Sequence, residues 1–293
     1  MKKYILLFLI AALLLCGCTQ QPQAQIAATT LPVYEFTSAL CEGTGLTVTQ
    51  LVTEAVSCLH DYSLNVEQVR SAEAAEVIVI SGAGLEDFMS NLLVGKHVVD
   101  SSAGITLMES SHAHDHGHEG TDHTAHEHEE DPHIWLSPLH AKEMARNICT
   151  GLCEAYPLHT AAFEANLITL LDKLDAVYAY GTQQLSSLRS RELITFHDGF
   201  AYLADSFDLS ILEAVEEESG SEASAAELIH LIEEVRHHKL NVLFTEKLGS
   251  VSAAQIIAAE TGCAICELDM AMHGESYFDS MYHNIDTLKG ALG

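Results

Sequence analysis

Short apolar segments alternate with amphipathic segments along most of the chain. Runs of β-branched or apolar residues predict strands at residues 26–31, 46–51, 76–80 and 97–100. Between them, apolar residues spaced three and four apart predict helices at residues 33–41, 65–74 and 84–93. Strands that alternate with helices are typical of right-handed β-α-β units, so we expect a parallel sheet flanked by helices in this part of the chain.

A longer helical pattern follows in the middle of the chain. Apolar residues keep mostly a spacing of three and four from residue 159 to residue 188, and no proline interrupts them. A helix of roughly thirty residues would be about 45 Å long, enough to run the length of a two-lobed body. The alternation then resumes, with predicted strands at 193–196, 242–245 and 264–267 and helices at 199–207, 223–237, 252–261 and 277–292.

The pattern therefore predicts an α/β fold of two lobes, each with a mostly parallel sheet flanked by helices. We expect an N-terminal lobe at residues 26–155, one long linking helix at 156–189 and a C-terminal lobe at 190–293. With 293 residues, of which 48% are hydrophobic, the chain is long enough for such a core.

Charge narrows the choice of partners. The chain has 13 Lys and Arg residues against 42 Asp and Glu residues, a formal net charge of −29. Such a surface repels nucleic acid and anionic membranes and attracts cations. The acidic residues are spread along the chain, so a solvated surface explains most of them, and acidity alone does not indicate a metal site.

The sequence at the N-terminus predicts that the protein is exported from the cytoplasm. Lys2 and Lys3 precede an apolar run at residues 5–15, which is typical of a signal peptide and too short to favour a permanent membrane span. The sequence Leu15-Cys16-Gly17-Cys18 resembles the bacterial lipobox, with Cys18 as the lipidated residue. We expect a signal peptide at 1–17, a lipidated tether at 18–25 and a mature protein at the outer face of the cytoplasmic membrane. An uncleaved anchor helix would give the same location.

Six cysteines lie beyond the signal peptide, at positions 41, 58, 149, 153, 263 and 266. An exported protein can pair them, but spacing does not assign connectivity. Cys263 and Cys266 have the CxxC spacing of some zinc and redox sites, yet no second CxxC accompanies them. A structural disulfide or buried thiols are the favoured interpretations of this pair.

Four candidate metal ligands each follow a predicted strand or close a loop beside one. They are His60, His133, His197 and Asp269. In open parallel sheets, ligands bind beyond the carboxyl ends of the strands. Singly, each residue is more often a surface or helix-capping residue, but four at equivalent positions, two from each lobe, favour a metal site. Three imidazoles and one carboxylate suit tetrahedral Zn²⁺.

A histidine-rich segment at residues 112–130 lies just before one of these ligands. Eight of the 24 residues from 112 to 135 are histidine, interleaved with Asp and Glu. Such spacing offers overlapping weak metal sites that need no fixed fold. A purification tag would not be internal, so we predict a zinc-collecting loop whose binding weakens as pH falls through about 6.5.

Several motifs together resemble the zinc- and manganese-specific solute-binding proteins of bacterial ABC importers. These motifs are HDY at 60–62, GAGLEDF at 82–88, DPHIWLSP at 131–138, FHD at 196–198 and YHNIDTL at 282–288. The resemblance covers nearly all of the chain after residue 26, and DPHIWLSP is its most specific part. It implies two α/β lobes with a connecting helix and the ligands His60, His133, His197 and Asp269. Glu246 also lies at a strand end, and we interpret it as a neighbour of the ligands, with ligation as the alternative.

The resemblance also implies a function, with alternatives. The histidine-rich insertion is typical of the zinc branch, so we expect a monomeric, lipid-anchored protein that passes Zn²⁺ to an ABC permease and is not an enzyme. A manganese-specific protein of the same family, or a zinc-sequestering surface lipoprotein or adhesin, shares these ligands. A zinc hydrolase would need an open coordination position and a general base, and no HExxH motif occurs.

Overall fold

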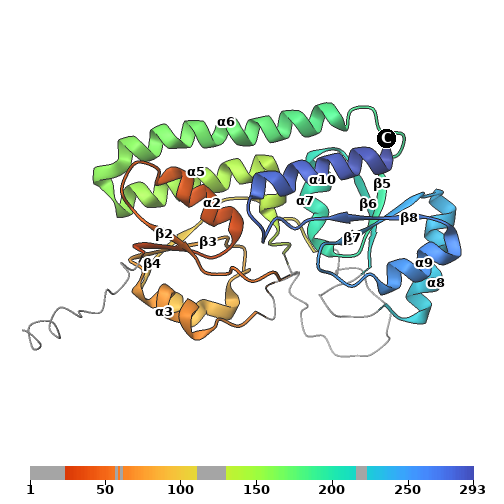
Figure 1. The fold of residues 1–293 in the computed structure, drawn as a ribbon, viewed down its shortest axis with the longest axis horizontal. Helices are drawn as coiled ribbons and strands as arrows, with labels where there is room; N and C mark the ends of the chain where they lie inside the picture. The colour runs from red at the N-terminus through yellow and green to blue at the C-terminus, as the bar shows by residue number, and fades with distance from the viewer. Residues whose placement is uncertain (1–23, 57–58, 60–61, 111–129, 216–222) are drawn as a thin grey trace, which may run out of the picture.

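Two α/β lobes lie side by side beneath one long helix, α6, in the computed structural model of the chain (Figure 1). The structure describes residues 24–56, 59, 62–110, 130–215 and 223–293. The predicted signal peptide, Cys18, Cys58, His60 and almost all of the histidine-rich segment lie outside the described residues.

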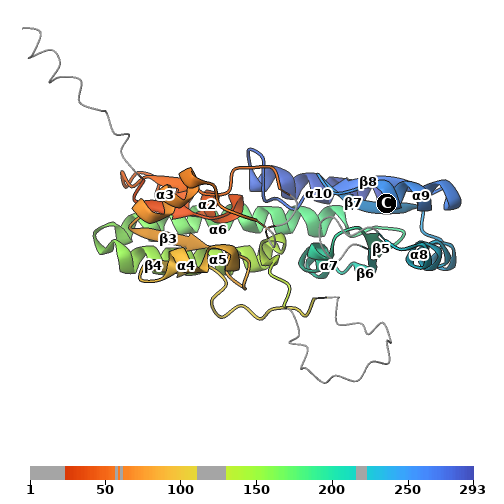
Figure 2. The same cartoon turned by 90° about the horizontal axis from the view of Figure 1, so that it is seen from below.

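The N-terminal lobe contains a parallel four-stranded sheet. Its strands run in the order β2 (Val48–Gln50), β1 (Ile26–Ala28), β3 (Val77–Ile80) and β4 (His97–Asp100). Helices α2 (Leu31–Leu40) and α5 (Pro138–Ala155) cover one face, and α3 (Val66–Ala74) and α4 (Ser90–Leu93) cover the other (Figures 1 and 2). Ile26 and Val77 face the first pair of helices while Ala27 and Ile78 face the second, so successive residues of each strand are buried on opposite sides.

The C-terminal lobe repeats this design. Its parallel strands run in the order β6 (Ser210–Ala214), β5 (Glu192–Thr195), β7 (Val242–Glu246) and β8 (Ala264–Leu268). Helices α8 (Ala225–His238) and α9 (Ser252–Thr261) cover one face, and α7 (Ala201–Ser206) and α10 (Tyr277–Leu292) cover the other. The predicted fold class is confirmed.

Helix α6 (Thr160–Gln184) crosses both lobes and has 25 residues, which makes it about 37 Å long. It buries Phe163, Leu170, Leu174 and Val177 in a single core cluster that also contains residues of both sheets. The helix is shorter at both ends than the predicted range of 159–188. A short 3-10 turn, Pro157–His159, separates it from α5, because proline disfavours a helical residue before it.

One local prediction was wrong, and two elements were missed. Strand β6 was not predicted, and α5 was not recognised as a separate helix. The single helix predicted at 84–93 is instead a turn, a 3-10 segment (Asp87–Met89) and the one-turn helix α4. Gly82 explains the turn, since its φ is +86° and a Cβ there would lie 2.0 Å from Asp100 Oδ1.

The five cysteines that the structure describes are all free thiols. Cys263 is buried and donates a hydrogen bond to the Leu240 carbonyl oxygen, whereas Cys266 is partly buried, so the buried-thiol interpretation holds for Cys263. Within the described ranges, no helix has the length and apolar character needed to cross a membrane.

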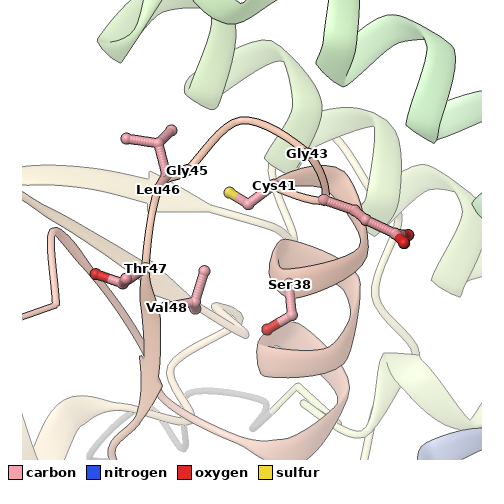
Figure 3. Close-up of a pocket in the computed structure, with 8 residues that line it drawn as sticks. Ser38, Cys41, Gly43, Gly45, Leu46, Thr47 and Val48 are labelled. Carbon is pink, nitrogen blue, oxygen red and sulfur yellow. The ribbon is translucent and has the colours of Figure 1, made fainter.

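A shallow hollow lies between the end of α2 and the start of β2 (Figure 3). Cys41 lies at its wall, where burial raises the pKa of the thiol to about 12. Ser38, Leu46 and Val48 also line it. The hollow is at the amino end of the sheet, whereas ligands of parallel sheets bind at the carboxyl end, so it is not the predicted metal site.

Candidate metal site

His133 is buried, with 4% of its surface exposed, and is oriented by Asp131. Asp131 Oδ1 accepts hydrogen bonds from the His133 main-chain N–H at 2.8 Å and from the ring Nδ1 at 2.7 Å. With the proton on Nδ1, the lone pair of the neutral ring is on Nε2, as a metal ligand requires. Asp131 therefore selects the tautomer of His133 that can bind a cation.

Trp135 links the His133 loop to the C-terminal lobe. Its ring lies 5.3 Å from that of His133, and its Nε1 donates a hydrogen bond of 2.7 Å to the Met270 carbonyl oxygen. The Tyr277 hydroxyl donates in turn to the Trp135 carbonyl oxygen at 2.7 Å. Trp135 and Tyr277 are fully buried, so these two polar bonds fasten the DPHIW motif to the other lobe.

His197 follows β5 and faces His133 across the lobes. The two ring centroids are 5.2 Å apart and the rings meet at 85°. Gly199 lies against both, because a Cβ there would be 2.9 Å from His197 Nδ1 and 3.0 Å from His133 Cγ. The glycine allows the two predicted ligands to approach each other.

Gly199 also fixes the protonation of His197. Its main-chain N–H donates to His197 Nδ1 at 2.7 Å, which places the proton of the neutral ring on Nε2. That nitrogen lies 3.7 Å from Glu246 Oε2, and Glu246 is buried at the end of β7. Binding a cation through Nε2 would require the single ring proton to be on Nδ1 instead, which breaks the hydrogen bond from Gly199; Glu246 is the carboxylate beside Nε2.

Asp269 follows β8 and is also buried, with 3% of its surface exposed. Its main-chain N–H donates to Asn284 Oδ1 at 2.7 Å, and Asn284 Nδ2 donates to its carbonyl oxygen at 2.7 Å. Its carboxylate accepts hydrogen bonds from the Ala271 N–H, the Ser280 hydroxyl and the Lys247 ammonium. Helix α10, which carries Ser280 and Asn284, therefore sets the position of this residue.

His273 lies in the loop after Asp269, and both of its ring nitrogens are shielded from solvent without a hydrogen bond from any described residue. Burial lowers the pKa of His273; the charge of Asp269 opposes this effect and that of Lys247 adds to it. Sequence patterns gave no reason to select Lys247, because its closeness to Asp269 arises only in the fold, and no motif marked His273.

The structure brings His133 and His197 together and places Asp269 at the carboxyl edge of the C-terminal sheet. His60 lies outside the described residues. Among the residues that are described, no three His, Cys, Asp or Glu side chains are grouped closely enough to bind one metal ion. The four-ligand set thus stays a prediction. It requires His60, and it requires Asp269 to come close to His133 and His197.

Two lobes with parallel sheets, a long helix across both and a buried histidine from each lobe at their contact are the architecture of a solute-binding protein. A family profile described as "Zinc-uptake complex component A periplasmic" matches residues 26–291. Because this match covers nearly the whole chain, the protein belongs to that family, as its motifs predicted.

Individual relatives agree with this assignment. The chain is 30% identical to the zinc-binding lipoprotein AdcA of Streptococcus pneumoniae serotype 4 over 99% of its own length, but it spans only 61% of that relative. The crystal structure of ZnuA has a TM-score of 0.77 at 28% identity and covers 92% of this chain and 100% of the solved one. The Zn(II)-bound ZnuA-like domain of Streptococcus pneumoniae AdcA has a TM-score of 0.74 at 26% identity, over 92% and 99% of the two chains.

Proposed function

We propose that this protein captures Zn²⁺ outside the cytoplasm and delivers it to the permease of an ABC importer. The observation that carries the proposal is the approach of two buried histidine rings to 5.2 Å at the contact between the lobes. Two buried imidazoles this close together, one of them beyond the carboxyl end of a parallel strand, are suited to metal binding. Membership in a zinc-uptake family and the zinc-binding names of the relatives support the same conclusion.

The proposed ligands are His60, His133, His197 and Asp269. Three imidazole nitrogens and one carboxylate oxygen match borderline-soft Zn²⁺, whereas Mn²⁺ favours more oxygen donors and a higher coordination number. Zinc is the cargo here, so the site must release it as well as bind it. Glu246 lies beside His197, where its carboxylate would take the proton from Nε2 while Nδ1 gains one, so that the ring stays neutral and Nε2 binds the metal.

Catalysis is not part of this proposal. A zinc hydrolase keeps one coordination position open to water and places a general base beside it. Four protein ligands close the coordination sphere, and each member of the proposed set is used in binding. The protein is therefore proposed to be a carrier and not an enzyme.

The remaining proposals concern location and delivery. Lipidation at Cys18 would anchor the protein to the outer face of the cytoplasmic membrane, and residues 18–25 would act as a tether. The protein would act there as a monomer that meets its permease by diffusion in the membrane plane. The histidine-rich segment at 112–130 would collect zinc next to His133, which follows it directly in the sequence.

The decisive experiment is metal analysis of the protein purified without chelators or metal-affinity resin, followed by competition between Zn²⁺ and Mn²⁺. We expect one tightly bound zinc per chain and retention of zinc in the presence of excess manganese. Preferential binding of manganese would assign the protein to the manganese branch, and the absence of any tight metal site would overturn the proposal.

A further inference from the structure

We propose that Lys247 is an exchangeable counter-ion of Asp269, which competes with zinc for this carboxylate and so limits zinc affinity and speeds zinc release. The inference rests on the proposed function, because it takes Asp269 as a zinc ligand. It adds a residue that no motif identifies and assigns it a role opposite to that of a ligand.

Lys247 and Asp269 differ strongly in burial. Lys247 Nζ lies 3.0 Å from Asp269 Oδ2, and the side chains are 42% and 4% exposed, respectively. A buried carboxylate is costly without a partner, so the lysine satisfies it. A half-exposed, flexible lysine can also move its ammonium into water at small cost, as an exchangeable partner must.

Lys247 is not required to position Asp269. Asn284 forms two hydrogen bonds of 2.7 Å with the main chain of Asp269, one in each direction. The Ala271 N–H donates to Oδ1 at 2.8 Å, and the Ser280 hydroxyl donates to Oδ2 at 3.1 Å. These contacts fix the residue from the main chain to the carboxylate, so the contribution that Lys247 adds is its positive charge.

The hydrogen bonds around the carboxylate show why this charge opposes a metal. Each carboxylate oxygen has about two lone pairs, and Oδ2 already accepts from both Lys247 and Ser280. A cation that binds through Oδ2 must displace one of these donors. A cation that binds through Oδ1 stays within a few ångströms of the ammonium and is repelled by it.

The backbone at Lys247 is held independently of its side chain. The Lys247 N–H donates to the Leu268 carbonyl oxygen at 2.8 Å, and the Gly249 N–H donates to the Glu246 carbonyl oxygen at 3.0 Å. Within this turn Leu248 has a φ of +76°, in the region that favours glycine. Glu246 and Lys247 are thus consecutive residues of one tight turn, with Glu246 beside His197 and Lys247 beside Asp269.

This arrangement allows a direct test with Lys247→Met, which keeps the aliphatic part of the side chain and removes its charge. Lys247→Arg keeps the charge. The control is Lys142→Met, which removes the same charge from an ion pair with Asp175 on α5 and α6. For each full-length protein, zinc affinity is measured by competition with a chelator and zinc release by stopped-flow mixing with excess chelator, after circular dichroism has verified folding.

Lys247→Met should bind zinc about three- to tenfold more tightly and release it more slowly by a similar factor, as expected for one partly screened charge near a divalent ion. Lys247→Arg and Lys142→Met should match the wild type within about twofold. Equal or weaker zinc binding by Lys247→Met overturns the proposal and would make Lys247 a positioning residue or a bystander.

The substitution Asp269→Asn tests separately whether Asp269 is a zinc ligand and whether Lys247 competes with zinc for it. If Asp269 is a ligand, the substitution weakens zinc binding, and the gain from Lys247→Met should then be smaller than in the wild-type background, because the lysine no longer competes for a carboxylate. A weakened Asp269→Asn together with an unchanged Lys247→Met overturns only the role of the lysine. Unchanged zinc affinity in Asp269→Asn overturns Asp269 as a ligand and the lysine proposal with it.

Discussion

The indole N–H of Trp135 donates a hydrogen bond of 2.7 Å to the carbonyl oxygen of Met270, across the contact between the two lobes. Trp135 is two residues after His133, and Met270 directly follows Asp269. One fully buried side chain thus connects the loops that carry two of the proposed ligands. The spacing of these loops depends on this bond as well as on α6.

Trp135→Phe tests this connection. The substitution leaves the Met270 carbonyl oxygen buried without its donor, which should lower the free energy of unfolding by about 1–3 kcal/mol. Zinc affinity should also fall, because the His133 loop keeps only one of its two hydrogen bonds to the C-terminal lobe, the one from Tyr277. Urea unfolding followed by circular dichroism measures the first effect and chelator competition the second.

The matched control is Tyr180→Phe, which removes an exposed hydrogen bond of 2.6 Å to Asp286. It should change both quantities little, since exposed hydrogen bonds contribute weakly to stability. If Trp135→Phe behaved like this control, the hydrogen bond from Trp135 to Met270 would contribute nothing to the contact between the lobes.

Much of the fold could be predicted because its elements have strong local patterns. Strand β4 and helices α9 and α10 have the bounds that the sequence predicted. Strand β6 could not be predicted, because it is a half-buried edge strand without the continuous apolar run of a central one. Helix α5 buries Met144, Ile148 and Leu152, which are four residues apart, so its helical pattern is present in the sequence.

The site was predictable only in part. His133 and His197 lie in short motifs, DPHIW and FHD, that sequence alone can recognise. The groups around Asp269 come from three separate segments: Lys247 after β7, Ala271 in the following loop, and Ser280 and Asn284 on α10. No local pattern connects these residues, since the tertiary fold alone brings them together.

Replacement of His60, His133 or His197 with Ala should each lower zinc affinity at least about tenfold, because each change removes one proposed ligand from a set of four. Isothermal titration with zinc measures the tightest site. The control is His230→Ala, a histidine on α8 whose side chain is 58% exposed. A variant that keeps wild-type affinity would show that its histidine is not a ligand.

Deletion of residues 112–129 should remove several weak zinc equivalents and keep one tight site. The deletion retains Asp131, which orients His133, and Trp135, which fastens the loop to Met270. Zinc titration should therefore lose its weak phase while the tight phase is unchanged. Loss of the tight site would mean that the histidine-rich segment supplies a principal ligand, contrary to its proposed role as a collector.

Gly199→Ala should weaken zinc binding although Gly199 is not a ligand. The added Cβ would lie 2.5 Å from Met270 Cε, 2.9 Å from His197 Nδ1 and 3.0 Å from His133 Cγ, so both rings must move. Overpacking of a buried site costs roughly 1–3 kcal/mol of stability. Thermal unfolding and zinc titration measure the two effects.

The comparison is Gly290→Ala, a helical glycine of α10 with open space around its Cβ position. That change should stabilise the protein by up to about 1 kcal/mol through helix propensity and leave zinc binding unchanged. Equal behaviour of the two alanine variants would contradict the close packing of the histidines around Gly199.

Glu86 gives the N-terminal lobe a stability that depends on pH. Its carboxylate accepts hydrogen bonds from the Thr29 hydroxyl at 2.6 Å, the Ser81 N–H at 2.7 Å and the Gly82 N–H at 2.9 Å. These bonds favour the charged form, but full burial outweighs them and, with the nearby charge of Asp100, raises the pKa of Glu86 from 4.5 to about 7.

The folded protein therefore binds this proton more tightly than the unfolded chain does. The resulting stabilisation is fully present below pH 4.5 and is lost as the pH rises through about 7. In Glu86→Gln this contribution is absent, so the stability of wild type relative to the variant should fall by up to about 3 kcal/mol between pH 4.5 and pH 8. Urea unfolding across this range measures the difference, with Glu154→Gln, an exposed change on α5, as the control. Parallel pH curves for wild type and Glu86→Gln would show that Glu86 keeps an ordinary pKa in the folded protein, with its three hydrogen bonds sufficient to hold the buried charge.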